Sequence, residues 1–197
     1  MTELDYTILA IIGRDGPLSA YDVRKEFSQS MTPTWSSSTG SVYPSIARLE
    51  AAGFVSASTP EGPRARKALS ITSAGLEVLD PWLTTITATT AAATPDPVRT
   101  RMFFLTFLPP ARRTEILRKA IEGTEAALQD AEQRRESRTP SKANEVQRLA
   151  SEGVLFELRA RLEWLRWFSA ELVRLGLEKP GAERPQAVHP ATPDSRT

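Results

Sequence analysis

The sequence predicts a mainly α-helical chain with one small β-hairpin in its first half and two long helices in its second. Apolar residues recur at helical spacing through most of the chain, which indicates amphipathic helices. The turn signal Glu61-Gly62-Pro63 separates two short extended segments and predicts the hairpin. Two helical patterns, residues 112–136 and 142–177, are long enough to form a helix pair.

Composition limits the classes of protein that this chain can belong to. With 197 residues, of which 40% are hydrophobic and 25% charged, it can form one or two globular domains. It has no cysteine, which excludes disulfides, zinc–thiolate sites and cysteine nucleophiles. No apolar run is long enough to cross a bilayer, and the acidic N-terminus lacks a signal-peptide pattern. We therefore expect a cytoplasmic protein without a membrane partner.

The chain also lacks the side chains that most enzymes need. Its single histidine, His189, lies in a Pro-rich tail, and no catalytic triad, histidine metal site or glycine-rich phosphate loop can be assembled. We expect no catalytic residue, no metal and no cofactor.

The segment from Ser38 to Val55 is predicted to form one short helix that leads into a strand. Thr39 or Ser41 can cap its first turn, and Pro44 fits only near a helix start. Gly53 suits the left-handed position that ends a helix. The inward residues recur at helical spacing: Val42, Ile46 and Leu49.

The opposite face of this helix is polar. It carries small hydroxyls, a phenol and a guanidinium, on Ser38, Ser41, Tyr43, Ser45 and Arg48. Such a face can lie in a groove of DNA and donate hydrogen bonds to phosphates and base edges. Taken alone, the pattern fits a core helix with a solvated face equally well.

A hairpin with a basic tip follows the helix. Residues 38–67 hold four basic and two acidic side chains, although the net charge of the whole chain is only +1. A helix followed by a basic hairpin is the winged helix-turn-helix arrangement, in which the helix reads the major groove and the hairpin touches the backbone beside it. The predicted DNA contacts are Ser38, Thr39, Ser41, Tyr43, Pro44, Ser45, Arg48, Arg64, Arg66 and Lys67.

Several motifs resemble the PadR family of transcriptional regulators, in the family's order and spacing. They are Ala20-Tyr21-Asp22-Val23, Gly40-Ser41-Val42-Tyr43-Pro44, Arg48-Leu49-Glu50, Gly53-Phe54-Val55 and Lys67-Ala68-Leu69-Ser70-Ile71-Thr72-Ser73-Ala74-Gly75. The resemblance covers roughly the first eighty residues, and the helical C-terminal half is similar to the family's longer subgroup. Two positions depart from the family: Ala20 replaces a usual glycine, and Ala68-Leu69 replaces a usual tyrosine pair in the wing. The resemblance implies a DNA-binding regulator, often one that senses a small aromatic or hydrophobic compound.

Two helices are expected before this central segment. Thr2 can cap a helix that reaches about Ile12, and Ser19 with Asp22 forms a variant of the capping box at the start of the next helix. The second helix is expected to turn Tyr21, Val23 and Phe27 inward. Tyr21 is interpreted as a core residue in preference to a contact.

Further start and break signals follow the hairpin. Thr72 or Ser73 can cap a helix that Pro81 is expected to kink or interrupt, and Asp96-Pro97 marks another helix start. Residues 102–108 are apolar nearly all round and are expected to be buried on more than one side. The predicted parts are a winged helix-turn-helix domain (1–83), a linker (84–95), a helical dimerisation and effector domain (96–178) and a disordered tail (179–197).

The two long helices carry apolar stripes at the alternating spacing of a helix pair. Two antiparallel helices cannot bury both stripes without a third surface, and a second subunit is the simplest source of one. The predicted dimerisation residues are Leu117, Ile121, Leu128, Leu155, Leu158, Leu162, Leu165 and Leu172.

Aromatic residues flank the stripe of the second long helix. Trp164 and Trp167 are three residues apart and therefore lie roughly 60° apart on that helix. They either pack against residues 102–107 or a second subunit, which we favour, or they line a pocket for an apolar effector. The residues of the hypothetical effector pocket are Phe103, Phe107, Trp164, Trp167 and Phe168.

These observations predict a sequence-specific DNA-binding transcriptional regulator. We expect an effector-responsive homodimeric repressor that binds a pseudo-palindromic operator in double-stranded DNA. The competing hypothesis is a helical adaptor that binds another protein and keeps a vestigial winged-helix domain. It explains the long helices equally well, but it does not explain why a basic hairpin follows a hydroxyl-rich helix.

Overall fold

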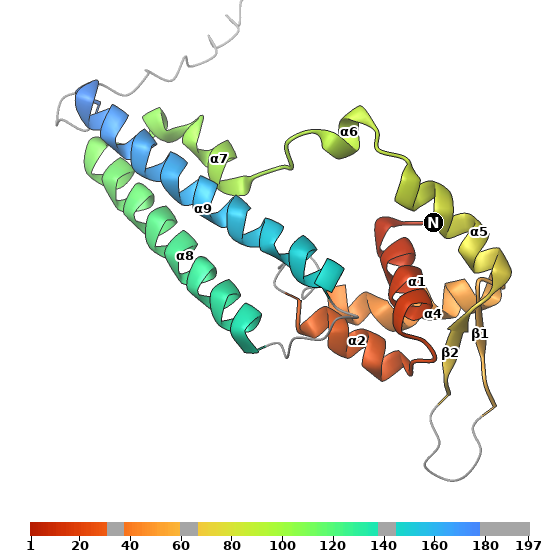
Figure 1. Cartoon of the computed structure of the whole chain (residues 1–197). Helices are drawn as coiled ribbons and strands as arrows, with labels where there is room; N and C mark the ends of the chain where they lie inside the picture. Colours follow the sequence, from red (N-terminus) through yellow and green to blue (C-terminus); the bar gives the residue numbers. More distant parts are fainter. Residues whose placement is uncertain (31–37, 60–66, 138–144, 178–197) are drawn as a thin grey trace, which may run out of the picture. The chain divides into compact units, whose positions relative to one another are not determined.

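The computed structural model describes residues 1–30, 38–59, 67–137 and 145–177. The described chain is mostly helical with a two-stranded hairpin, which confirms the predicted fold class (Figure 1). It divides into two compact units, Met1–Ala93 and Thr94–Thr197. The boundary falls inside residues 84–95, the predicted linker, which also hold the short helix α6 (Ala88–Ala91).

Unit 1 contains the N-terminal helices and the hairpin. Its elements are α1 (Glu3–Asp15), α2 (Ala20–Ser28), the 3-10 turn η1 (Ser38–Ser41), α4 (Val42–Ala51), β1 (Val55–Ala57), β2 (Leu69–Ile71) and α5 (Ser73–Thr84). Three helix starts are confirmed: Thr2 and Ser19 form capping boxes, and the Thr72 hydroxyl accepts from the Gly75 N–H. Side-chain oxygens in these positions satisfy backbone N–H groups that have no partner within the helix.

α1 is the centre of the core of unit 1. It packs against α4, α5 and β2, and its Ile8, Leu9 and Ile12 are fully or almost fully buried. The predicted inward residues of α4, namely Val42, Ile46 and Leu49, are confirmed in the same cluster. Val23 and Phe27 of α2 are also buried there, but the prediction for Tyr21 is wrong, because its side chain lies on the outer side of α2 and is half exposed.

The hairpin pairs β1 and β2 in antiparallel register, with Ser56 opposite Ser70. Leu69 pairs on its other side with Leu18 and is buried, so the leucine of the Ala68-Leu69 departure serves as a core residue. Gly53 has φ +76°, as predicted for a residue that ends a helix.

Two local features of unit 1 differ from the prediction. The segment that begins at Ser38 does not start as one capped helix: η1 precedes α4, and the Ser41 side chain makes no capping bond. The Ser41 backbone is already helical, whereas a side-chain cap needs an extended residue. Of the two outcomes predicted for Pro81, interruption does not occur, because α5 continues to Thr84 and the Pro81 carbonyl accepts from the Thr85 N–H.

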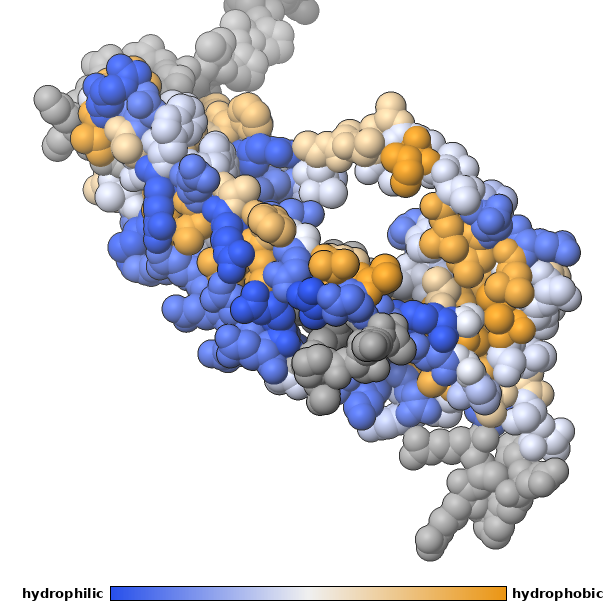
Figure 2. Space-filling view, viewed as in Figure 1, coloured by the Kyte–Doolittle hydropathy of each residue, from blue (hydrophilic) through white to orange (hydrophobic). Residues whose placement is uncertain are grey.

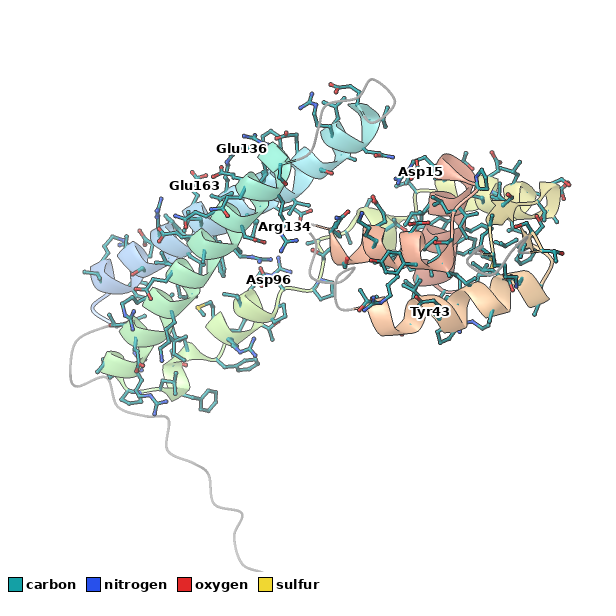
Figure 3. The ribbon with its side chains drawn as sticks, turned by 90° about the horizontal axis from the view of Figure 1, so that it is seen from below. Asp15, Tyr43, Asp96, Arg134, Glu136 and Glu163 are labelled. Carbon is teal, nitrogen blue, oxygen red and sulfur yellow. The ribbon has the colours of Figure 1, made fainter. Side chains whose placement is uncertain are left out.

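Unit 2 is built on an antiparallel helix pair. α8 (Pro110–Ser137) and α9 (Glu145–Arg174) lie side by side, and α7 (Pro97–Met102) and the 3-10 turn η2 (Leu105–Phe107) precede them (Figures 1 and 3). The Asp96 carboxylate caps α7 as predicted and also pairs with Arg161 of α9, at 3.0 Å. The core contains Met102, Leu105, Leu117, Leu165 and Leu172.

Residues 102–108 are not buried on several sides as predicted. Met102 and Leu105 face the core, but Phe103 is 76% exposed and Phe107 61% exposed. α7 ends at Met102 and a 3-10 turn follows, so residues three apart share a face and only one face meets the helix pair. Phe104, also exposed, contacts Phe107 instead.

The leucine stripes also differ from their predicted role. Leu117, Leu155, Leu162, Leu165 and Leu172 are buried within a single chain, because α8 and α9 cover each other's stripes. Ile121, Leu128 and Leu158 are half-buried along the same two helices. Burial of the five leucines therefore requires no second subunit. Among the described helices, none combines the length and the low charge that a membrane span requires.

Candidate nucleic-acid interface

The outward face of α4 is the surface that the sequence predicts to read DNA. Tyr43, Pro44, Ala47 and Arg48 are exposed on it, at spacings that place them on one side of the helix. Tyr43 lies at the edge of the unit (Figure 3). η1 leads into this face, with Ser41 exposed and Ser38 and Thr39 half-buried. Ala47 was not among the predicted contacts, because only hydrogen-bonding side chains were considered. Its spacing of four residues from Tyr43 places it on the same face and would have identified it.

Ser45 does not belong to this face. Its side chain is fully buried, and its hydroxyl accepts a hydrogen bond from Nη2 of Arg48 at 2.8 Å. The prediction of Ser45 as a DNA contact is therefore wrong. Ser45 lies between the inward residues Val42 and Leu49 on the helix surface, so it faces α1 instead of solvent.

Arg48 connects the reading face to the first helix of the chain. Its Nη2 donates to Oδ1 of Asp5 at 2.7 Å, and the Asp5 side chain is only 7% exposed. Oδ2 of the same carboxylate accepts from the Thr2 N–H in the capping box of α1. Burial alone would raise the pKa of Asp5, but the hydrogen bonds from Thr2, Arg48 and Ser45 favour the carboxylate and keep its pKa below the ordinary value. The fold thus brings together Asp5 and Arg48, which lie 43 positions apart in the sequence.

The base of the hairpin is fastened to α4. Nζ of Lys67 pairs with Oε2 of Glu50 at 2.8 Å, and the Lys67 side chain is exposed. This pair joins the residue two positions before β2 to α4. The other two predicted wing contacts, Arg64 and Arg66, lie outside the described residues.

α2 carries basic side chains that are not among the DNA contacts predicted from the sequence. Arg24 and Lys25 are exposed, and α2 packs against both η1 and α4. In helix-turn-helix proteins the helix before the reader crosses the DNA backbone. Cationic residues on that helix are therefore candidates for phosphate contacts.

The predicted effector residues divide into two groups. Trp164 and Phe168 pack on each other, with ring centroids 5.8 Å apart, at the margin of the unit 2 core. Trp167, Phe103 and Phe107 are exposed. Among the described residues, no ring contact joins the two groups, so the five aromatic residues do not form one cluster in this structure.

Comparison with known proteins agrees with the sequence motifs. Residues 8–80 match the family model described as "Transcriptional regulator PadR-like family". The negative transcriptional regulator PadR of Bacillus subtilis (strain 168) is 32% identical over 85 residues, which are 42% of this chain and 46% of that protein. The sequence match thus spans about half the length of this curated relative.

The fold as a whole is similar to solved structures of Bacillus subtilis PadR. The structure in complex with operator DNA has a TM-score of 0.73 at 21% identity, over 87% of this chain and 99% of that chain. The complex with p-coumaric acid has a TM-score of 0.70 at 20% identity, over 86% and 94%. Residues 8–80 are thus similar to the PadR-like family of transcriptional regulators, and the described chain has the fold of these solved structures.

Proposed function

We propose that this protein is a sequence-specific DNA-binding transcriptional regulator and that it acts as a homodimeric repressor in the cytoplasm. The observation that carries the proposal is the exposed face of α4, with Tyr43, Pro44 and Arg48 beside a hairpin that Lys67 ties to the same helix. Each subunit would insert η1 and α4 into the major groove, with the hairpin along the flanking backbone. The matched relative is a negative regulator, which favours repression.

The chain offers a surface for the second subunit that the leucine stripes do not provide. A second stripe runs along the outer side of α9 at alternating steps of three and four residues, and all of its members are exposed: Val146, Leu149, Gly153, Phe156, Ala160, Glu163, Trp167 and Ala170. Phe156 is 68% exposed and Trp167 58% exposed. Figure 2 shows apolar patches between charged side chains along the helix pair.

This outer stripe is self-complementary. Its steps read the same in both directions, so two copies running antiparallel place Phe156 against Ala160, and Trp167 against Leu149. Large residues then meet smaller ones in each layer, which allows facing layers to interdigitate. A two-fold axis at this seam is the symmetry of the commonest homodimers. We therefore assign dimerisation to the outer stripe.

A small aromatic or hydrophobic effector is part of the proposal. Support comes from the PadR complex with p-coumaric acid and from the aromatic residues of unit 2. An effector acts by preferring a dimer in which the two readers have the wrong spacing, and only its differential affinity shifts the population. Added p-coumaric acid should quench tryptophan fluorescence and weaken DNA binding. A folded Trp164→Ala/Trp167→Ala variant that responds like the wild type would exclude this site.

The class of protein also argues against catalysis, because the family consists of regulators. The alternative function is a helical adaptor, and the exposed outer stripe is the observation that favours it. Removal of Lys67 and the basic residues before it separates the two: a regulator loses DNA affinity, whereas an adaptor keeps its protein partner.

The direct experiment is fluorescence anisotropy with the DNA upstream of the protein's own coding region. Binding is measured across a salt series, with random DNA of equal length as the control. The proposal predicts tight, salt-dependent binding to the first DNA and binding weaker by at least about a thousandfold to the second. Equal, weak binding to both would leave the adaptor as the better explanation.

A further inference from the structure

Arg48 is only partly available to DNA. A guanidinium has five N–H donors, and both donors of Nη2 are used within the protein, by Asp5 at 2.7 Å and Ser45 at 2.8 Å. Nε and Nη1 make no hydrogen bond to any described residue, and the side chain is 56% exposed. The arginine is thus held within the protein through Nη2, while Nε and Nη1 can donate hydrogen bonds to a ligand.

This arrangement limits what Arg48 can recognise. Bidentate recognition of guanine needs two donors on a shared edge of the guanidinium, and both such edges include Nη2. With Nη2 occupied, Nη1 and Nε lie on different edges and can each give only single hydrogen bonds. Single charge-assisted bonds suit a phosphate oxygen, for which no base edge has to be matched.

The anchor for Arg48 is rigid. Asp5 is buried, its Oδ2 accepts from the Thr2 N–H at 2.9 Å, and its own N–H donates to the Thr2 hydroxyl at 3.2 Å. The capping box of α1 therefore holds the carboxylate, and the carboxylate holds the guanidinium on the flank of α4. A long arginine side chain that is already ordered loses less conformational entropy when it binds DNA.

Resting on the proposed function, we infer that Asp5 is a positioning residue for DNA binding. It aligns Arg48 as a clamp for one backbone phosphate on the flank of α4 and removes Arg48 from base readout. Base discrimination then falls to the exposed residues between η1 and Ala47. A negatively charged residue on α1 thereby increases the affinity for a negatively charged ligand.

The test is the salt dependence of DNA binding by Asp5→Asn, Arg48→Gln and the double variant, with operator and random DNA. Each lost phosphate contact lowers the slope of log K against log salt by about 0.9. We expect each single variant to lose about that much per subunit, and the double variant to lose no more. The ratio of operator to random affinity stays at the wild-type value, because no base contact is lost.

Two outcomes overturn the inference. If Asp5→Asn keeps the wild-type slope, Asp5 stabilises α1 without positioning Arg48. If Arg48→Gln lowers the ratio of operator to random affinity, Arg48 reads bases. Asp96→Asn is the matched control, because it alters another capping carboxylate that pairs with an arginine, Arg161, but lies in unit 2; it should leave the slope unchanged. Failure of the proposed function looks different, since the wild type itself would then not prefer its operator.

Discussion

Arg113 carries a buried positive charge in unit 2 and is only 3% exposed. Its guanidinium donates to three backbone carbonyls: Leu108 at 2.7 Å, Leu177 at 2.6 Å and Thr106 at 3.2 Å. These oxygens lie at or just beyond the ends of η2 and α9, where helix carbonyls lack partners within the helix and carry partial negative charge. One side chain therefore joins the turn before α8 to the end of α9.

Replacing Arg113 by methionine should lower the free energy of unfolding by about 2–4 kcal/mol, because buried carbonyls lose their donors. Thermal or urea unfolding of the full chain measures the change. Arg112→Met is the matched control, since Arg112 is the exposed neighbour on the same helix turn, and its effect should stay within about 0.5 kcal/mol. Equal effects of the two substitutions would contradict this role.

Asp96 links stability to pH. Burial raises its pKa, but bonds from the N–H groups of Arg99 and Val98 and the charge of Arg161 outweigh burial, so the pKa is lower than in the unfolded chain. Ionised Asp96 therefore stabilises the fold at pH values above its pKa in the unfolded chain. This stabilisation is lost as the pH falls through its pKa in the folded chain. Asp96→Asn keeps a good N-cap but removes the charge. Between pH 7 and 3 the melting temperature of this variant should fall less than that of the wild type. Parallel curves would show that the charge contributes nothing.

At the scale of the element, local signals determine where helices start. The capping residues Thr2, Ser19, Thr72 and Asp96 could be identified from the sequence because each cap involves only the next two or three residues. The contact between Asp5 and Arg48 could not, because it depends on how α1 packs on α4. The sequence pattern alone therefore places Arg48 on an open face and Ser45 on the wrong side of the helix.

The stripes of α9 show the same limit for a whole helix. Periodicity identifies an apolar stripe, but it does not state whether the neighbouring helix or another subunit covers it. The leucine stripe faces α8, and the outer stripe with Phe156 and Trp167 stays exposed. The exposed aromatics of residues 103–107 escaped prediction for a similar reason, since a 3-10 turn replaces the expected helix.

The two stripes should respond differently to a charge. Phe156→Asp should convert the dimer to a folded monomer, because only the outer seam loses its packing. Leu162→Asp should instead destabilise the chain by roughly 3 kcal/mol or more, because it buries a charge between α8 and α9. Analytical ultracentrifugation and circular dichroism separate the two results. A Phe156→Asp variant that remains a dimer would place the two-fold axis elsewhere.

At the scale of the molecule, the proposed regulation requires two readers at a fixed spacing. A single α4 offers few cationic groups, and the chain as a whole has a net charge of only +1, so one subunit gains little from phosphate contacts. Joining two subunits makes the second binding event intramolecular and raises the apparent affinity. The proposed function therefore couples the outer stripe to the reading face, although they lie in different units.

Hydroxyl-radical and methylation footprinting of the upstream DNA shows whether paired α4 helices recognise it. We predict two protected major-groove patches, about one helical turn apart and related by a two-fold axis, with protected backbone at their flanks. The Phe156→Asp monomer should lose both patches at the protein concentration that protects them in the wild type. A single protected patch, or none at concentrations where the wild type is dimeric, would contradict DNA recognition by paired α4 helices.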